Sequence, residues 1–157
     1  MKRVHAVVAI AVLALALVPG AASAKTYRAK LKGQPFGNYE IAPRFSGSAS
    51  LTTGRNAKLT VKAKKLVKGK YKIQLRKARG GKQPCKTRTG KGGKGAAKRG
   101  VGGWKYAPLI VDASSKGTAT GTAKRFSVAR RSVYYVVIYK GRNTVTMCGV
   151  IAGKPKK

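Results

Sequence analysis

Alternating apolar and polar residues run through much of the chain and predict short β-strands. In residues 57–66 the apolar positions Leu59, Val61 and Ala63 share one face, and lysines occupy most of the other. Residues 69–76 alternate in the same way. A side-chain period of two residues is typical of a half-buried strand. The pattern therefore predicts two successive strands with one apolar and one basic face each.

Six further segments are predicted as strands, at residues 25–32, 45–53, 108–112, 117–126, 133–140 and 144–152. The segment 133–140 is apolar on both faces, as expected of a central strand. Residues 77–107 are rich in Gly and Lys and predict a long loop. About eight short strands, with no helix after residue 24, predict an all-β sandwich or barrel.

The N-terminus has the pattern of a secretory signal peptide. Lys2 and Arg3 precede an apolar run, which ends in the small residues Ala22-Ser23-Ala24. The run is shorter than the roughly 20 residues of a membrane span, although an anchor is the alternative. We therefore expect cleavage after residue 24. A single domain of residues 25–157 would remain, with a basic tail at 153–157 and no transmembrane segment, outside the cell or in its envelope.

The chain has two cysteines, Cys85 and Cys148. In a secreted protein two cysteines most simply form one disulfide. Two free thiols are the alternative.

Several of these segments together resemble the copper/zinc superoxide dismutase family and its secreted dismutase-like (CHRD-type) domains. The similarity lies in the strand 69–76, the loop to Cys85, the segments 109–112 and 134–139, and Cys148-Gly149-Val150-Ile151. It extends over roughly residues 45–152. It implies a Greek-key β-sandwich in which a Cys85–Cys148 disulfide ties the long loop to the barrel.

The metal ligands of that family are missing from this chain. Gln74, Arg76 and Tyr139 occupy the positions of three family histidines, and the only histidine, His5, lies in the predicted signal peptide. Copper and zinc require imidazole, thiolate or carboxylate donors. We therefore expect no bound metal, no other cofactor and no dismutase activity. The only two acids, Glu40 and Asp112, lie far apart in the sequence and do not predict acid–base catalysis.

The charge of the chain is extreme, with 36 Lys+Arg against 2 Asp+Glu and a formal net charge of +34. Such a charge attracts polyanions through long-range electrostatics and counterion release. We expect residues 57–66 and 70–77 to form a hairpin with one basic outer face, extended by the loop. The predicted binding residues are Lys58, Lys62, Lys64, Lys70, Lys72, Arg76, Lys82, Arg88, Lys91 and Lys94.

The leading hypothesis is a secreted, metal-free dismutase-like β-sandwich that binds extracellular or envelope polyanions, with teichoic acid, anionic lipid headgroups and extracellular DNA as candidates. Specific nucleic-acid readout is not expected, because a single Arg79-Gly80-Gly81 unit is weak evidence and the tyrosines suit a core. The alternatives are a redox enzyme of the dismutase family with a divergent metal site, a structural module that binds an envelope protein, and lysines that are simply solvated.

Overall fold

The computed structural model describes residues 24–33, 44–78, 85, 100–141 and 144–153, and these form an all-β fold. Nine antiparallel strands make one sheet in the order β5-β7-β3-β2-β1-β9-β8-β4-β6. Their bounds are β1 Thr26–Gly33, β2 Ser46–Thr52, β3 Ala57–Lys64, β4 Gly69–Lys77, β5 Trp104–Tyr106, β6 Leu109–Val111, β7 Lys116–Ala123, β8 Tyr134–Lys140 and β9 Thr144–Ala152. The all-β prediction is therefore confirmed. Residues 1–23 of the predicted signal peptide, residues 154–157 of the predicted basic tail and most of the predicted loop lie outside the described residues.

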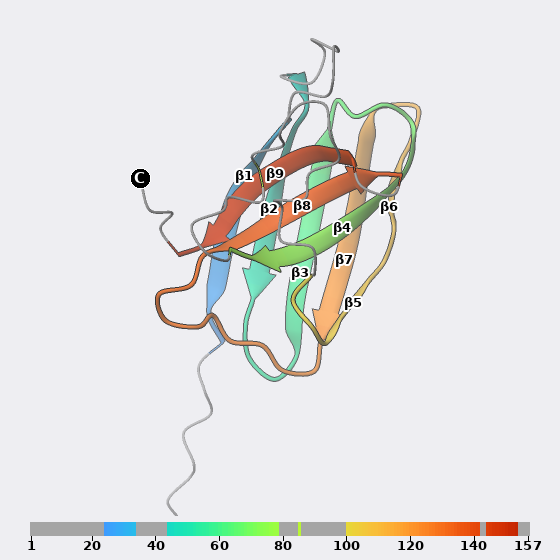
Figure 1. Cartoon of the computed structure of the whole chain (residues 1–157). Helices are drawn as coiled ribbons and strands as arrows, with labels where there is room; N and C mark the ends of the chain where they lie inside the picture. The colour runs from blue at the N-terminus through green and yellow to red at the C-terminus, as the bar shows by residue number, and fades with distance from the viewer. Residues whose placement is uncertain (1–23, 34–43, 79–84, 86–99, 142–143, 154–157) are drawn as a thin grey trace, which may run out of the picture.

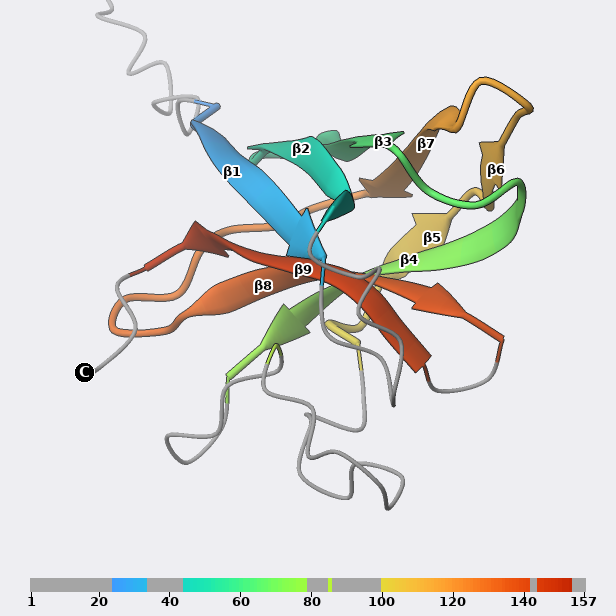
Figure 2. The same cartoon turned by 90° about the horizontal axis from the view of Figure 1, so that it is seen from above.

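The sheet curls into a half-barrel with two facing layers (Figure 1). Seen from above, β1, β2, β3 and β7 lie over β9, β8 and β4 (Figure 2). Strands β1 and β9 join the layers through only two residue pairs, Lys32–Cys148 and Gly33–Met147. Next to them, a Cβ atom on Gly149 would collide with the main-chain oxygen of Lys30, so glycine permits the close approach at this bend.

The two ends of the sheet meet on the opposite side of the half-barrel. Gly117 in β7 packs directly on the main-chain oxygen of Ile110 in β6. The β5 residue Tyr106 accepts a 2.9 Å hydrogen bond at its hydroxyl from the Leu75 amide of β4. These contacts bring β6 to β7 and β5 to β4, so that the layers enclose a common core.

The core contains the inward side chains of both layers. Among the large residues with almost no exposed surface are Leu51, Leu59, Ile73, Leu75, Ile138 and Met147. Edge-to-face contacts link Trp104 to Phe126 and Phe126 to Tyr134. The tyrosines Tyr71, Tyr134, Tyr135 and Tyr139 are all buried, which confirms their predicted packing role.

The predicted hairpin between residues 57–66 and 70–77 is wrong. Strand β3 pairs with β2 and β7, whereas β4 pairs with β6 and β8. The connection crosses between layers: Leu66 is fully buried, and the Tyr71 hydroxyl donates a 2.7 Å hydrogen bond to the Val67 carbonyl. Alternation identified the inward residues of both strands, but it carries no information on which strands are neighbours.

The predicted loop 77–107 contains a short strand that the sequence pattern did not indicate. Strand β5, Trp104–Tyr106, pairs with β7, and the rings of Trp104 and Tyr106 stack with centroids 6.0 Å apart. Three residues after a Gly-rich segment are too few to show a period of two, which explains why this strand was missed.

Candidate functional site: the two outer faces of the sheet

The outer face of β1, β2, β3 and β7 consists only of basic and hydroxyl side chains. We call it the hydroxyl–lysine face. Its residues are Thr26, Arg28, Lys30 and Lys32 of β1; Ser46, Ser48, Ser50 and Thr52 of β2; Lys58, Thr60, Lys62 and Lys64 of β3; and Lys116, Thr118, Thr120 and Thr122 of β7. Because the apolar residues of these strands point to the core, no apolar or acidic side chain belongs to the face.

Strand register arranges the hydroxyl–lysine face in rows across the sheet. Lys30, Ser48, Lys62 and Thr118 form one row, and Arg28, Ser50, Thr60 and Thr120 form the next. The column of β2 contains only serine and threonine, and it lies between the basic residues of β1 and β3. The long cationic side chains therefore flank a strip of short hydroxyl side chains.

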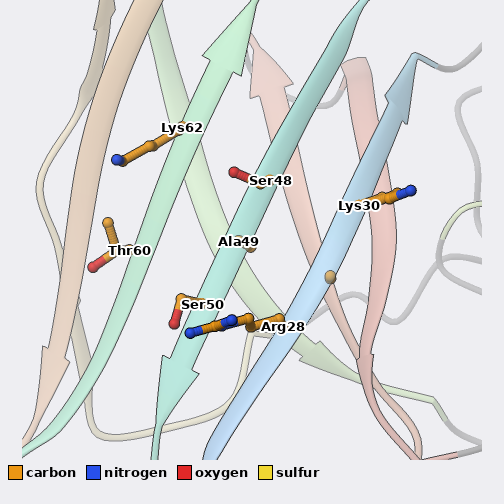
Figure 3. Close-up of a pocket in the computed structure, with 8 residues that line it drawn as sticks. Arg28, Lys30, Ser48, Ala49, Ser50, Thr60 and Lys62 are labelled. Atoms are coloured by element: carbon orange, nitrogen blue, oxygen red, sulfur yellow. The ribbon is translucent and has the colours of Figure 1, made fainter.

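A hollow of about 560 Å³ lies over this strip. Its polar lining consists of Arg28, Lys30, Ser48, Ser50, Thr60 and Lys62. Figure 3 shows Lys30 and Lys62 extending away from β2 on opposite sides, which leaves Ser48 open between them, while the Arg28 side chain reaches toward Ser50.

The outer face of β4, β8 and β9 is different, because its centre is apolar and buried. We call it the covered face. Tyr135, Val137, Tyr139, Val145 and Cys148 form a second hydrophobic cluster there, separate from the main core, with exposed fractions of 5% or less. Ala78, Cys85, Val133 and Val150 pack against this cluster. A sheet that buries both sides at β8 explains why residues 133–139 are apolar on both faces.

The disulfide between Cys85 and Cys148 closes on the covered face, as predicted. The two cysteines are 63 residues apart in sequence. Cys148 belongs to β9 and to the second hydrophobic cluster, and Cys85 packs against that cluster. The bond therefore fixes a point between β4 and β5 against the sheet.

Gln74, Arg76 and Tyr139, which the sequence resemblance predicted at the positions of metal-binding histidines, lie together on the covered face. The Arg76 Nε–H donates a 3.1 Å hydrogen bond to the Gln74 Oε1 atom. The Arg76 guanidinium lies over the Tyr139 ring, 4.8 Å from its centroid, in a cation–π contact. The fold therefore brings these three residues into contact.

The chemistry of this trio does not fit a copper or zinc site. The Gln74 oxygen accepts from Arg76, and a guanidinium repels a metal cation. Burial raises the pKa of Tyr139 to about 12, and the neighbouring Arg76 only partly offsets this, so the phenol stays neutral at physiological pH. Among the described residues, no three His, Cys, Asp or Glu side chains group as metal ligands.

The Tyr139 hydroxyl is buried without a hydrogen-bond partner among the described residues. A buried donor left unpaired costs about 1–3 kcal/mol. A Cβ atom on Gly100 would lie 3.3 Å from the Gln74 side chain, so the segment before β5 packs against Gln74. The trio therefore combines a buried tyrosine with two half-buried polar side chains.

The predicted polyanion-binding residues do not form one surface. Lys58, Lys62 and Lys64 belong to the hydroxyl–lysine face, whereas Lys70, Lys72 and Arg76 point outward from β4 in the other layer. The loop residues Lys82, Arg88, Lys91 and Lys94 lie outside the described residues.

Sequence reasoning missed the partners that the fold gives to the β3 lysines. Arg28 and Lys30 of β1, together with Ser48 and Ser50 of β2, complete the surface on one side. The signal was present in residues 26–32, where Thr26, Arg28 and Lys30 alternate with the inward residues. Only the strand order, however, reveals that β1, β2 and β3 are neighbours.

Asp112 lies at the start of the turn between β6 and β7. Its Oδ1 atom accepts a 2.6 Å hydrogen bond from the Ser114 hydroxyl and a 3.2 Å bond from the Lys116 amide. These bonds, with the Ser114 hydroxyl contributing most, lower the pKa of Asp112. The carboxylate therefore stabilises the turn between β6 and β7. The other acid, Glu40, lies outside the described residues.

Comparison of the chain with protein-family models, curated proteins and solved structures gave no match. Within the part of the chain that the structure describes, no helix is long and apolar enough to cross a membrane.

Proposed function

We propose that the protein binds extended polyanions through its hydroxyl–lysine face, in the cell envelope or outside the cell. In this proposal it is not an enzyme and binds no metal. The single observation that carries the proposal is the composition of that face: every outward residue of β1, β2, β3 and β7 is basic or carries a hydroxyl group. A solvated surface that serves only solubility normally intersperses charges of both signs.

The arrangement of the cations supports binding to an anionic partner. The hydroxyl column on β2 separates the basic residues of β1 from those of β3, so that Lys30 and Lys62 have Ser48 between them, although Lys64 and Lys116 lie directly opposite each other on β3 and β7. Like charges directly opposite each other destabilise a sheet, and this spacing reduces that cost. A net charge of +34 nevertheless leaves strong repulsion, which a polyanion would relieve.

We further propose that the scaffold is a Greek-key β-sandwich of the copper/zinc superoxide dismutase type. Two observations support this. Strands β1, β2 and β3 are consecutive antiparallel neighbours, and the last strand, β9, lies beside β1, so that the first and last strands join the two facing layers. The Cys85–Cys148 bond is also the one that the sequence resemblance implies.

Retention on immobilised heparin tests the function. We expect the protein, without residues 1–24, to elute only far above the physiological ionic strength of about 0.15 M, because many cations release counterions together. Elution at or below that ionic strength would contradict the proposal.

A further inference from the structure

The hollow over β2 has the dimensions and chemistry of a binding site for one class of polyanion. We infer that it binds a linear phosphodiester polymer with a short hydroxylated spacer and no bases, of which poly(glycerol phosphate) is the simplest example. This inference rests on the proposed function and specifies the ligand and the place where it binds.

Cations lie on both sides of the hollow. Arg28 and Lys30 line one side and Lys62 lines the other, with Ser48 and Ser50 between them. Neighbouring strands are about 4.8 Å apart, so Lys30 and Lys62 stand roughly 10 Å apart at their Cα atoms. One polymer chain that lies along β2 can therefore contact cations on both sides at once.

The spacing of residues along one face of a strand matches the repeat length of such a polymer. Residues on one face of a strand recur about every 6.8 Å, which is the spacing from Arg28 to Lys30 and from Ser50 to Ser48. A glycerol phosphate unit has six main-chain bonds, twice the number in an amino-acid residue. Its extended length is accordingly about 7 Å, by analogy with the 3.3–3.6 Å of a residue. Successive phosphates can then meet successive rows of the face.

The short side chains of the hollow can hydrogen-bond to both the phosphate and the hydroxyl groups of such a polymer. Ser48, Ser50 and Thr60 carry hydroxyls that can donate to phosphate oxygens and can also accept from hydroxyls of the polymer. Arginine offers a planar pair of donors that matches a phosphate, and it reaches toward Ser50 at one end of the hollow (Figure 3). The floor is thus suited to a polymer that alternates phosphate with hydroxylated carbon.

The absence of aromatic residues in the lining argues against single-stranded nucleic acid. Proteins that bind single strands usually stack bases on aromatic side chains, which contributes about 1–3 kcal/mol per base. None of the residues that line the hollow is aromatic. In the adjacent parts of the described sheet, Tyr27 and Tyr106 pack against the core. A phosphodiester backbone without bases therefore matches the site better.

The test compares two variants of equal charge. Arg28→Gln/Lys30→Gln/Lys62→Gln removes three cations from the hollow. Lys70→Gln/Lys72→Gln/Lys140→Gln removes three exposed cations from the other layer. For poly(glycerol phosphate) at about 0.15 M salt, we expect the first variant to bind at least about tenfold more weakly. We also expect its log–log salt slope to fall by about 2. The second variant should change less than about threefold.

A second pair of variants leaves the charge unchanged. Ser48→Leu fills the floor of the hollow, and Thr118→Leu adds the same side chain in the same row on the far side of Lys62. We expect Ser48→Leu to weaken binding of poly(glycerol phosphate) severalfold and Thr118→Leu to leave it unchanged. The midpoint of thermal unfolding of each variant checks that both remain folded.

The outcomes separate this inference from the proposed function. Equal losses of affinity in both triple variants, with no effect of Ser48→Leu, would refute the hollow as the binding site. General polyanion binding would remain as proposed. Tighter binding of poly(dT) than of poly(glycerol phosphate) would refute the assignment of a polymer without bases. Failure of the unmodified protein to bind heparin or either polymer would overturn the proposed function itself.

Discussion

The two outer faces of this sheet differ in composition and in burial. Strands β1, β2, β3 and β7 put only lysine, arginine, serine and threonine on their outer side, and that side is open. The outer side of β4, β8 and β9 is centred on an apolar cluster, closed by a disulfide and by the packed trio of Gln74, Arg76 and Tyr139. One layer thus carries only charged and hydroxyl groups on its outer side, whereas the other uses its outer side for packing. This difference is the basis for proposing that the first face binds and that the second contributes stability.

Loss of the disulfide should be the most damaging single change to the covered face. Replacing Cys85 and Cys148 by serine together removes a link across 63 residues, and the chain-entropy model gives a loss of about 4 kcal/mol in the free energy of unfolding. Chemical denaturation measures this loss in the free energy of unfolding. Under conditions where the variant is still folded, heparin retention should persist. Loss of retention by the folded variant would show that binding depends on the covered face.

Truncation of one side chain on each face compares them directly. Val137 is fully buried in the second cluster, and Val137→Ala should lower the free energy of unfolding by about 2 kcal/mol through lost burial and a small cavity. Thr118→Ala, an equal truncation on the exposed face, should change it by less than about 1 kcal/mol. Similar losses from both variants would mean that the hydroxyl–lysine face is also packed against something.

Removal of the Tyr139 hydroxyl should have the smallest effect and the opposite sign. Tyr139→Phe deletes a buried donor that has no partner among the described residues, and it keeps the ring under Arg76. We expect the free energy of unfolding to rise by up to about 1 kcal/mol. A clear loss of stability would mean that the hydroxyl does have a partner.

The same residue predicts an alkaline limit to stability. Burial raises the pKa of Tyr139 to about 12, above the value of about 10 for an unfolded tyrosine. The unfolded state therefore releases the phenol proton first, so the free energy of unfolding is unaffected by this group below about pH 10 and falls as the pH rises from 10 through 12. Denaturation at several pH values should show a smaller loss for Tyr139→Phe. An unchanged loss would assign the effect to other groups, with Tyr106, whose pKa is also raised to about 12, as the first candidate.

The sequence was sufficient for every described strand except the short β5, but not for which strands are neighbours. Alternation located the inward residues of β3 and β4, because a half-buried strand needs one apolar face. It could not show that the chain crosses between layers at Leu66, because pairing depends on contacts distant in sequence. The candidate site was also predictable only in part. The lysines of β3 were found, whereas the hollow was not, since it exists only once β1 and β2 lie beside them.

Residue-resolved mapping of the bound polymer tests the central claim most directly. In a titration of the protein, without residues 1–24, with poly(glycerol phosphate), followed by amide chemical shifts, we expect the largest changes at Arg28, Lys30, Ser48, Ser50 and Lys62. Amides of β8 and the centre of β4 should change little. Changes centred instead on the basic residues between 82 and 94, or on β4, would contradict the account and place the binding surface elsewhere.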